Sequence, residues 1–184
     1  MAKIFEEIDD TLAAFIREQK MFFIATAPLA ADGHVNLSPK GLDTLRILDP
    51  RTVAYLDLTG SGVETISHLK ENGRFVLMFC AFDGRPKILR LHGHGAVLER
   101  GDAEFDELLT LFPTLPGTRA IIKLSVERIA DSCGWGVPQF EFKGERDQLT
   151  RYSTQIGDDG LRKAQLESNM TGLDDLPGLR APSF

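Results

Sequence analysis

The chain has 184 residues and a formal net charge of −6, and 42% of its residues are hydrophobic, which suits one folded domain with no broad basic surface for nucleic acid. No stretch approaches the roughly 20 apolar residues of a membrane-spanning helix, so no membrane partner is expected. Because the two cysteines, Cys80 and Cys133, form no CxxC pair and the first residues carry acids where a signal peptide would be basic, we expect a cytoplasmic protein.

The first two-thirds of the chain alternates short apolar runs with turn signals. Apolar residues at helical spacing predict a first helix near residues 4–18. Strands are then predicted at residues 21–27 and 34–38, at two runs within 45–58, and at 75–82, 88–98 and 120–129. The run at 75–82 is continuously apolar, which predicts a strand buried on both faces. Gly93 and Gly95 would let another backbone approach the next strand closely.

Two further helices are predicted near residues 63–71 and 102–112, the second starting at Asp102. This order lacks a regular βαβ alternation. It therefore predicts a mainly β fold with α-helices (α+β), a mostly antiparallel barrel of six to eight strands with flanking helices. Residues 1–140 would form the domain, including the first helix. Residues 141–184 would be an extension packed on it or partly irregular, since the chain turns polar and irregular from about residue 131.

Asn36-Leu37-Ser38-Pro39-Lys40-Gly41 ends the second predicted strand. Lys40 supplies a mobile cation and Ser38 a hydroxyl, and Gly41 leaves room for a close approach. An anion such as a phosphate would find suitable donors here. The alternative is an ordinary surface turn with an exposed lysine.

Thr59-Gly60-Ser61-Gly62 precedes the second predicted helix. A glycine turn that opens a helix presents backbone N–H groups and the positive end of the helix dipole, which is a general phosphate-binding device. The alternative is a capping box, because Ser61 and Glu64 have the S-x-x-E spacing. A charged Glu64 would repel a nearby phosphate.

Arg90, His92 and His94 share one face of a predicted strand. No carboxylate or cysteine is adjacent, so a polar face at a subunit contact or ligand rim is favoured and no metal is expected. Trp135, the single tryptophan, would cover a planar ring or serve as a hydrophobic plug. No nucleophile–base pair can be nominated from spacing.

Five segments carry a resemblance when taken together: residues 36–41, Tyr55 to Gly62, Glu64-Thr65, Met-Phe-Cys-Ala-Phe at 78–82 and Leu-Arg-Leu-His-Gly at 89–93. In this order they resemble the pyridoxamine 5′-phosphate oxidase-related family of FMN-binding split-barrel flavoproteins, over about residues 20–140. The likeness is nearest to a little-characterised bacterial branch. It implies a split β-barrel and a homodimer with FMN held in clefts between the subunits.

The resemblance also implies site residues. Ser38 and Lys40 match the phosphate ligands at the strand end, and Ser61 and Thr65 match the loop and helix start. Two positions are expected at the flavin ring: Arg90, reaching across the dimer, and Trp135, stacking on the ring or the substrate. The family's first phosphate arginine has no counterpart near Asn36, and Gly62 and Val63 replace the basic pair after the loop serine. Arg74 and Arg90 are the candidate replacements.

The implied activity is that of an FMN-dependent oxidoreductase that passes hydride equivalents to or from an unknown small molecule. The C-terminal arginine and histidine signature of the vitamin B6 enzyme is not recognisable, which argues against pyridoxamine phosphate as substrate. The alternatives are a flavin- or haem-binding protein without turnover, and a dimeric structural module with an empty cleft.

Overall fold

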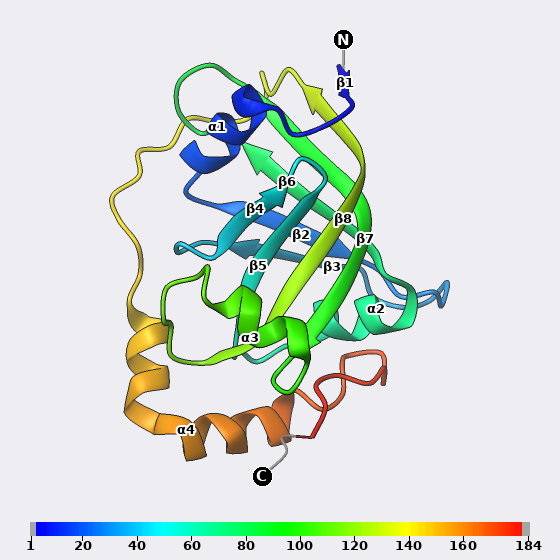
Figure 1. Cartoon of the computed structure of the whole chain (residues 1–184), viewed down its shortest axis with the longest axis vertical. Coiled ribbons are helices and arrows are strands. Elements are labelled where there is room, and N and C mark those ends of the chain that lie inside the picture. The colour runs from blue at the N-terminus through cyan, green and yellow to red at the C-terminus, as the bar shows by residue number, and fades with distance from the viewer. Residues whose placement is uncertain (1–2, 182–184) are drawn as a thin grey trace.

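The computed structural model describes residues 3–181. Residues 1–2 of the predicted domain 1–140 and residues 182–184 of the predicted extension 141–184 lie outside the described residues. Within that range the chain forms strands and helices in the order shown in Figure 1. They are β1 (Ile4–Phe5), α1 (Asp10–Glu18), β2 (Phe22–Thr26), β3 (Asn36–Lys40), β4 (Leu45–Asp49), β5 (Thr52–Leu58), α2 (Glu64–Asn72), β6 (Arg74–Cys80), β7 (Ile88–Glu99), α3 (Ala103–Leu109), β8 (Thr118–Ser132) and α4 (Gln148–Ser168).

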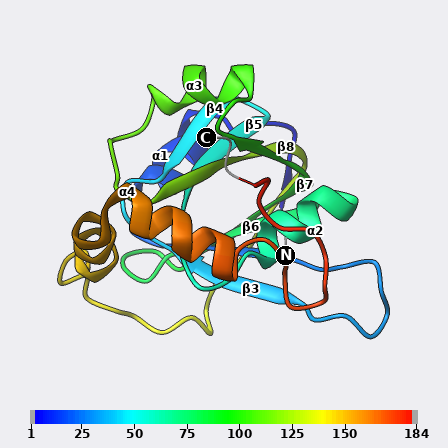
Figure 2. The same ribbon diagram turned by 90° about the horizontal axis from the view of Figure 1, so that it is seen from below.

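The strands form one antiparallel sheet. Its order is β3-β2-β6-β7-β8-β5-β4, and β1 pairs with β8. Seen end-on, this sheet curls into a barrel (Figure 2). Since β3 and β4 are the two ends of the strand path in the described chain, the barrel is split between them. The predicted mainly β, antiparallel α+β fold is therefore confirmed.

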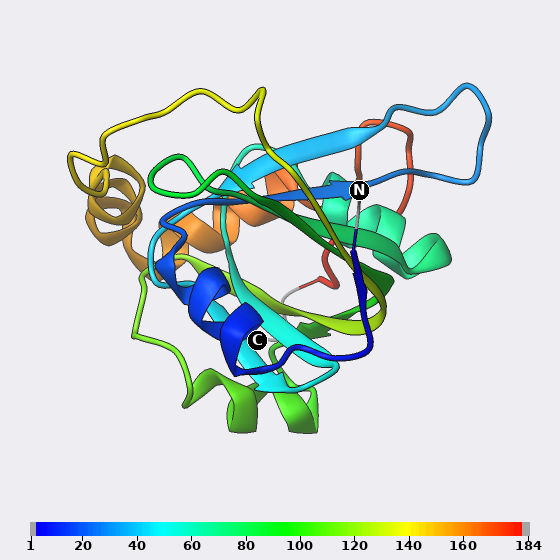
Figure 3. The same ribbon diagram turned by 90° about the horizontal axis from the view of Figure 1, so that it is seen from above.

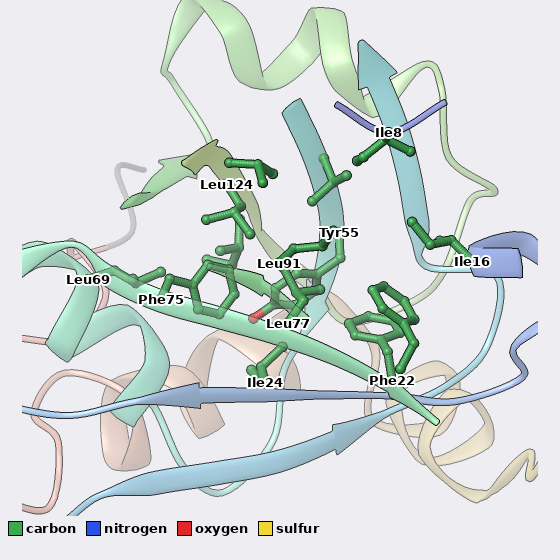
Figure 4. Packing of buried hydrophobic residues seen from close by; sticks show 14 of the residues in the cluster. Ile8, Ile16, Phe22, Ile24, Tyr55, Leu69, Phe75, Leu77, Leu91 and Leu124 are labelled. Carbon is green, nitrogen blue, oxygen red and sulfur yellow. The ribbon is translucent and has the colours of Figure 1, made fainter. Parts of the chain in front are cut away.

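The barrel interior is filled by alternate residues of its strands, as the two-residue period of a strand requires. Ile24, Leu77 and Leu91 are fully buried and point toward Tyr55 (Figure 4). Helix α1 adds buried apolar residues such as Leu12 to the same cluster, and it lies across one end of the barrel (Figure 3). A second cluster joins α3 to the outer side of β5 and β8.

Two glycines occupy positions that a side chain would disturb. A Cβ at Gly93 would collide with the carbonyl oxygen of Ser125, because β7 and β8 shift register there. This confirms the predicted close approach of another backbone at Gly93, whereas a Cβ at Gly95 would meet the side chains of Leu69 and Phe75. Gly73 ends α2 in the left-handed region, at φ 70°.

Three expectations were wrong in detail. The predicted helix at 4–18 starts only at Asp10, because Ile4 and Phe5 pair as a strand with Ala130 and Ile129. The strand β6 is buried on one face only in this chain, since its outward residues are partly exposed. The region predicted to be irregular after residue 131 contains α4, which bends at Gly157, where φ is 64°.

The four helices of residues 3–181 are all too short or too polar to cross a membrane. Helix α4 is polar on most of its surface and buries only Ser153 and Leu161. It runs across the lower end of the barrel (Figures 1 and 2).

Candidate functional site

A cleft of about 1700 Å³ opens where the barrel is split. One wall is the edge strand β3, and the facing wall is the end of β5 with the loop that follows it. Four residues predicted from sequence line this cleft together: Ser38, Lys40, Ser61 and Thr65. The fold thus gathers two motifs that are about 20 residues apart in sequence on either side of one opening.

Asp57 is buried beside the cleft and holds two cations. Lys40 Nζ lies 2.9 Å from Oδ1 of Asp57, and Arg119 Nε lies 2.8 Å from its Oδ2. Burial alone would raise the pKa of Asp57, but the charges of Arg119 and Lys40 outweigh burial and hold that pKa below its usual value. The three groups together carry one net positive charge, which suits an anionic ligand.

Arg119 also braces the glycine loop. Its Nη2 donates to the carbonyl oxygen of Gly62 at 2.9 Å. Its Nη1 is buried and has no hydrogen-bond partner among residues 3–181. Arg119 lines the cleft, so the site contains a second cation that sequence reasoning missed. The available signal was an arginine at the start of the apolar run of β8.

A chain of hydrogen bonds links the strand motif to the helix start. Ser38 Oγ donates to Oδ1 of Asn36, and Nδ2 of Asn36 donates to Oγ1 of Thr65 at 2.9 Å and to Oγ1 of Thr26 at 3.1 Å. The buried Nδ1 of His68 lies 2.9 Å from the same Thr26 oxygen. Asn36 therefore fixes the two hydroxyl donors, Ser38 and Thr65, relative to one another.

The predicted capping box does not form. Helix α2 starts at Glu64 after Val63, and no side chain within residues 3–181 caps it. The first-turn N–H groups are thus left without a side-chain partner, as an anion site requires. The Glu64 carboxylate folds back over the loop. Its Oε2 lies so close to Gly62 that a Cβ at that position would collide with it.

Residues 139–149, after β8, form the outer wall of the cleft. The ring of Phe140 packs against Phe82 with 5.3 Å between centroids, and its N–H donates to the Phe82 carbonyl oxygen at 2.9 Å. Glu145 accepts a hydrogen bond from the N–H of Leu42 at 3.3 Å. The segment supplies aromatic and acidic side chains and one arginine, Arg146, and Lys40 and Arg119 add positive charge from the strands.

Three basic or aromatic candidates lie elsewhere. Arg90 is on the outer face of the sheet, where it donates to Ser132 Oγ at 3.1 Å. Arg74 is also outside the cleft and donates to the Pro28 carbonyl oxygen. Trp135 is 83% exposed and does not line the cleft of this chain. The structure thus brings together the four phosphate candidates and leaves Arg90 and Trp135 apart from them.

Known proteins resemble this chain along most of its length. The family profile described as pyridoxamine 5′-phosphate oxidase matches residues 8–133. A pyridoxamine 5′-phosphate oxidase family protein of Aspergillus flavus, ustO, is 36% identical over 98% of this chain and 79% of the relative. The match to that relative therefore extends into the region after residue 133.

Solved structures show the same fold. The crystal structure of a single-residue variant of HupZ from Group A Streptococcus aligns with a TM-score of 0.54 at 23% identity, over 68% of this chain and 99% of that one. A Lactobacillus delbrueckii protein described as a candidate pyridoxamine 5′-phosphate oxidase aligns with a TM-score of 0.54 at 20% identity, over 69% and 98%. The family profile and the Aspergillus relative show that the chain belongs to the pyridoxamine 5′-phosphate oxidase family.

Proposed function

We propose that this protein binds FMN in the split-barrel cleft and acts as a flavin-dependent oxidoreductase on a small molecule. The observation that carries the proposal is the convergence of Lys40, Arg119, Ser38 and Thr65 on one opening next to an uncapped helix start. These are the donors that a phosphate monoester takes: two cations, two hydroxyls and backbone N–H groups.

The residues present fit the phosphate end of FMN. Lys40 and Arg119 would neutralise the phosphate, and Asp57 keeps both cations in place. Thr65 would donate a hydrogen bond to its oxygens, and Ser38 would do so once its hydroxyl turns from Oδ1 of Asn36 toward the phosphate. The unpartnered Nη1 of Arg119 leaves one donor of this cluster unused within the described chain.

Bound FMN would supply the transfer of hydride equivalents, while the protein supplies position and electrostatics. The segment after β8 would shield the cleft from water through Phe140 and its contact with Phe82. No nucleophile–base pair is expected from the sequence, which fits chemistry that resides in a cofactor rather than in a side chain.

We further propose a homodimer formed through the outer face of β2, β3, β6 and β7. This face carries a shallow apolar hollow. Its lining includes Phe23, Ala25, Leu37, Val76 and Met78, with Arg90 and His92 at its side. Leu37 is 65% exposed in the single chain, and covering such a surface removes apolar area from water. Arg90 would then lie at the subunit contact, from which it could reach a partner's cleft.

The proposed cellular location is the cytoplasm. Cys80 and Cys133 are both free thiols, one buried and one exposed. An unpaired exposed cysteine fits a reducing compartment.

The test is to purify the protein, remove any bound cofactor, and titrate separate samples with FMN, riboflavin and haem. The expected result is a flavin absorption spectrum, quenched flavin fluorescence and tighter binding of FMN than of riboflavin. Reduction of the bound flavin by light or by an added donor, followed by reoxidation, would support the oxidoreductase. Haem binding without flavin binding, or no binding of either, would overturn the proposal.

A further inference from the structure

The end of α4 and the residue that follows it pack against the glycine loop. Gln165, near the end of α4, donates from Nε2 to Oγ1 of Thr59 at 2.8 Å. Asn169, just after α4, donates from Nδ2 to the carbonyl oxygen of Gly60 at 2.9 Å. Both contacts span more than 100 residues of sequence and meet the two residues that enter the loop.

We propose that Gln165 and Asn169 are positioning residues that hold the Thr59–Gly62 loop in its phosphate-binding shape. This inference rests on the proposed FMN site. The phosphate would contact the loop from the cleft. The two amides hold the loop from outside the cleft, through Thr59 and Gly60. Neither residue lines the cleft itself.

Asn169 is placed with little freedom. Its side chain is fully buried, and its Oδ1 has no partner among residues 3–181. Exchanging its amide oxygen and nitrogen would set oxygen against the Gly60 carbonyl, so the donating orientation is the one that the site favours. A buried polar group that leaves one atom unpaired costs free energy, which fits a residue kept for its contact with the loop.

The hairpin after Asn169 is fastened to α2 and to the rest of the barrel. Thr171 bridges to Pro177, and the N–H of Leu179 donates to the Asn169 carbonyl oxygen at 2.8 Å. On α2, Ser67 Oγ donates to the Leu176 carbonyl oxygen at 3.3 Å. Figures 1 and 2 show this final segment lying beside α2. The backbone of Asn169 is therefore held in place by a hairpin that contacts α2.

Thr59 is held on a second side. Its N–H and its Oγ1 both donate to the carbonyl oxygen of Gly117, at 2.7 and 2.9 Å. Gln165 donates to the same Thr59 hydroxyl oxygen, which therefore accepts one hydrogen bond and donates another. The first residue of the loop, Thr59, is thus held by the turn before β8 and by α4. The last residue, Gly62, is held by Arg119. The family profile ends at residue 133, so Gln165 and Asn169 belong to a part of this chain that the profile does not match.

The test compares FMN with riboflavin, which lacks the phosphate, on the full-length apoprotein. Asn169→Ala and Gln165→Met should each raise the FMN dissociation constant about five- to tenfold, since each removes one hydrogen bond that shapes the loop. The riboflavin constant should change less than about twofold, because the ring and ribityl contacts are untouched. Ser67→Ala is the matched control: it weakens the same hairpin but not the loop, and should leave both constants unchanged.

The outcomes separate the two proposals. If the wild-type protein binds neither flavin, the FMN site itself is wrong and this inference falls with it. The wild type can prefer FMN while the variants weaken the binding of FMN and of riboflavin equally, or weaken neither. In that case the positioning role is overturned and the FMN site stands. Thermal unfolding of each apoprotein identifies a variant that does not fold. Such a variant is replaced by Asn169→Gln or Gln165→Asn, which keep an amide donor. These replacements should restore at least part of the wild-type preference for FMN over riboflavin.

Discussion

Arg119 and Asp57 form a buried ion pair, with Nε 2.8 Å from Oδ2, although 62 residues separate them in sequence. The pairing of β5 with β8 sets Asp57 opposite Ala120 and so brings Arg119 alongside it. The pair joins the interior of the fold to the cleft, because the same guanidinium reaches the Gly62 carbonyl oxygen. Fold stability and the shape of the glycine loop are therefore coupled at one residue.

Breaking this pair should destabilise the fold. Arg119→Met leaves Asp57 with Lys40 as its remaining partner, and should lower the free energy of unfolding by about 3 kcal/mol. In the double variant Asp57→Asn with Arg119→Met no buried charge is stranded, so its loss should fall short of the sum of the single losses. Urea unfolding at pH 7 measures all four proteins. Strict additivity would show that the two side chains act independently.

The same carboxylate should leave a signature in acid. Because the folded state lowers the pKa of Asp57, its contribution to stability is present above its unfolded pKa and is lost as pH falls through the folded value. Asp57→Asn should remove that part of the acid dependence. The comparison uses urea midpoints of wild type and variant, each measured below and above pH 4. Parallel curves would contradict the assignment.

Lys40→Ala should weaken FMN binding about ten- to a hundredfold, because a charge-assisted contact to phosphate contributes on the order of 1.5–3 kcal/mol. Asp57 keeps Arg119 as a partner in this variant, so the fold should survive. Lys123→Ala is a suitable control, since that lysine pairs with Glu104 away from the cleft. Fluorescence titration measures the FMN dissociation constant of each variant and of the wild type. An unchanged FMN constant in Lys40→Ala would remove Lys40 from the site.

Sequence patterns located most strands of this fold but not its last helix. Period-two alternation and turn residues are local signals, and they place β2 to β8 close to their observed bounds. Helix α4 lacks a comparable signal, because it buries only two residues and contains Gly157 and Gly160. Ile4 fitted a helical pattern locally, but the pairing of Ile4 and Phe5 with β8 overrides it.

The candidate site was predictable to the extent that it depends on local motifs. Ser38, Lys40, Ser61 and Thr65 follow from a strand end and a glycine loop, and they meet in one cleft. Arg119 was not predictable in this way, because its place depends on the register between β5 and β8, which no local pattern states. The contacts of Gln165 and Asn169 with the loop are likewise set by tertiary packing.

A charge placed on the proposed dimer face should separate the subunits. Met78 lies on the outward face of β6 and is only partly buried, so Met78→Glu leaves the barrel core intact. Burying an unpaired carboxylate in an apolar contact is strongly unfavourable. Light scattering should give twice the 20.4 kDa chain mass for wild type and the single mass for the variant. Leu111→Glu, at an exposed residue beyond α3, should remain dimeric. A wild-type particle of 20.4 kDa would contradict the dimer.

Glu64 opens α2 and lies over Gly62, where its charge would oppose a bound phosphate. Glu64→Gln keeps the shape of the side chain and removes that charge, so FMN should bind about three- to tenfold more tightly, a difference on the order of 1 kcal/mol. Riboflavin should respond little, and added salt should narrow the gap between wild type and variant because it screens the repulsion. Glu107→Gln, on the exposed side of α3, controls for the change in net charge. Weaker FMN binding in Glu64→Gln would instead mean that the carboxylate accepts a hydrogen bond from the ligand, and a ribityl hydroxyl would be the group of FMN that supplies it.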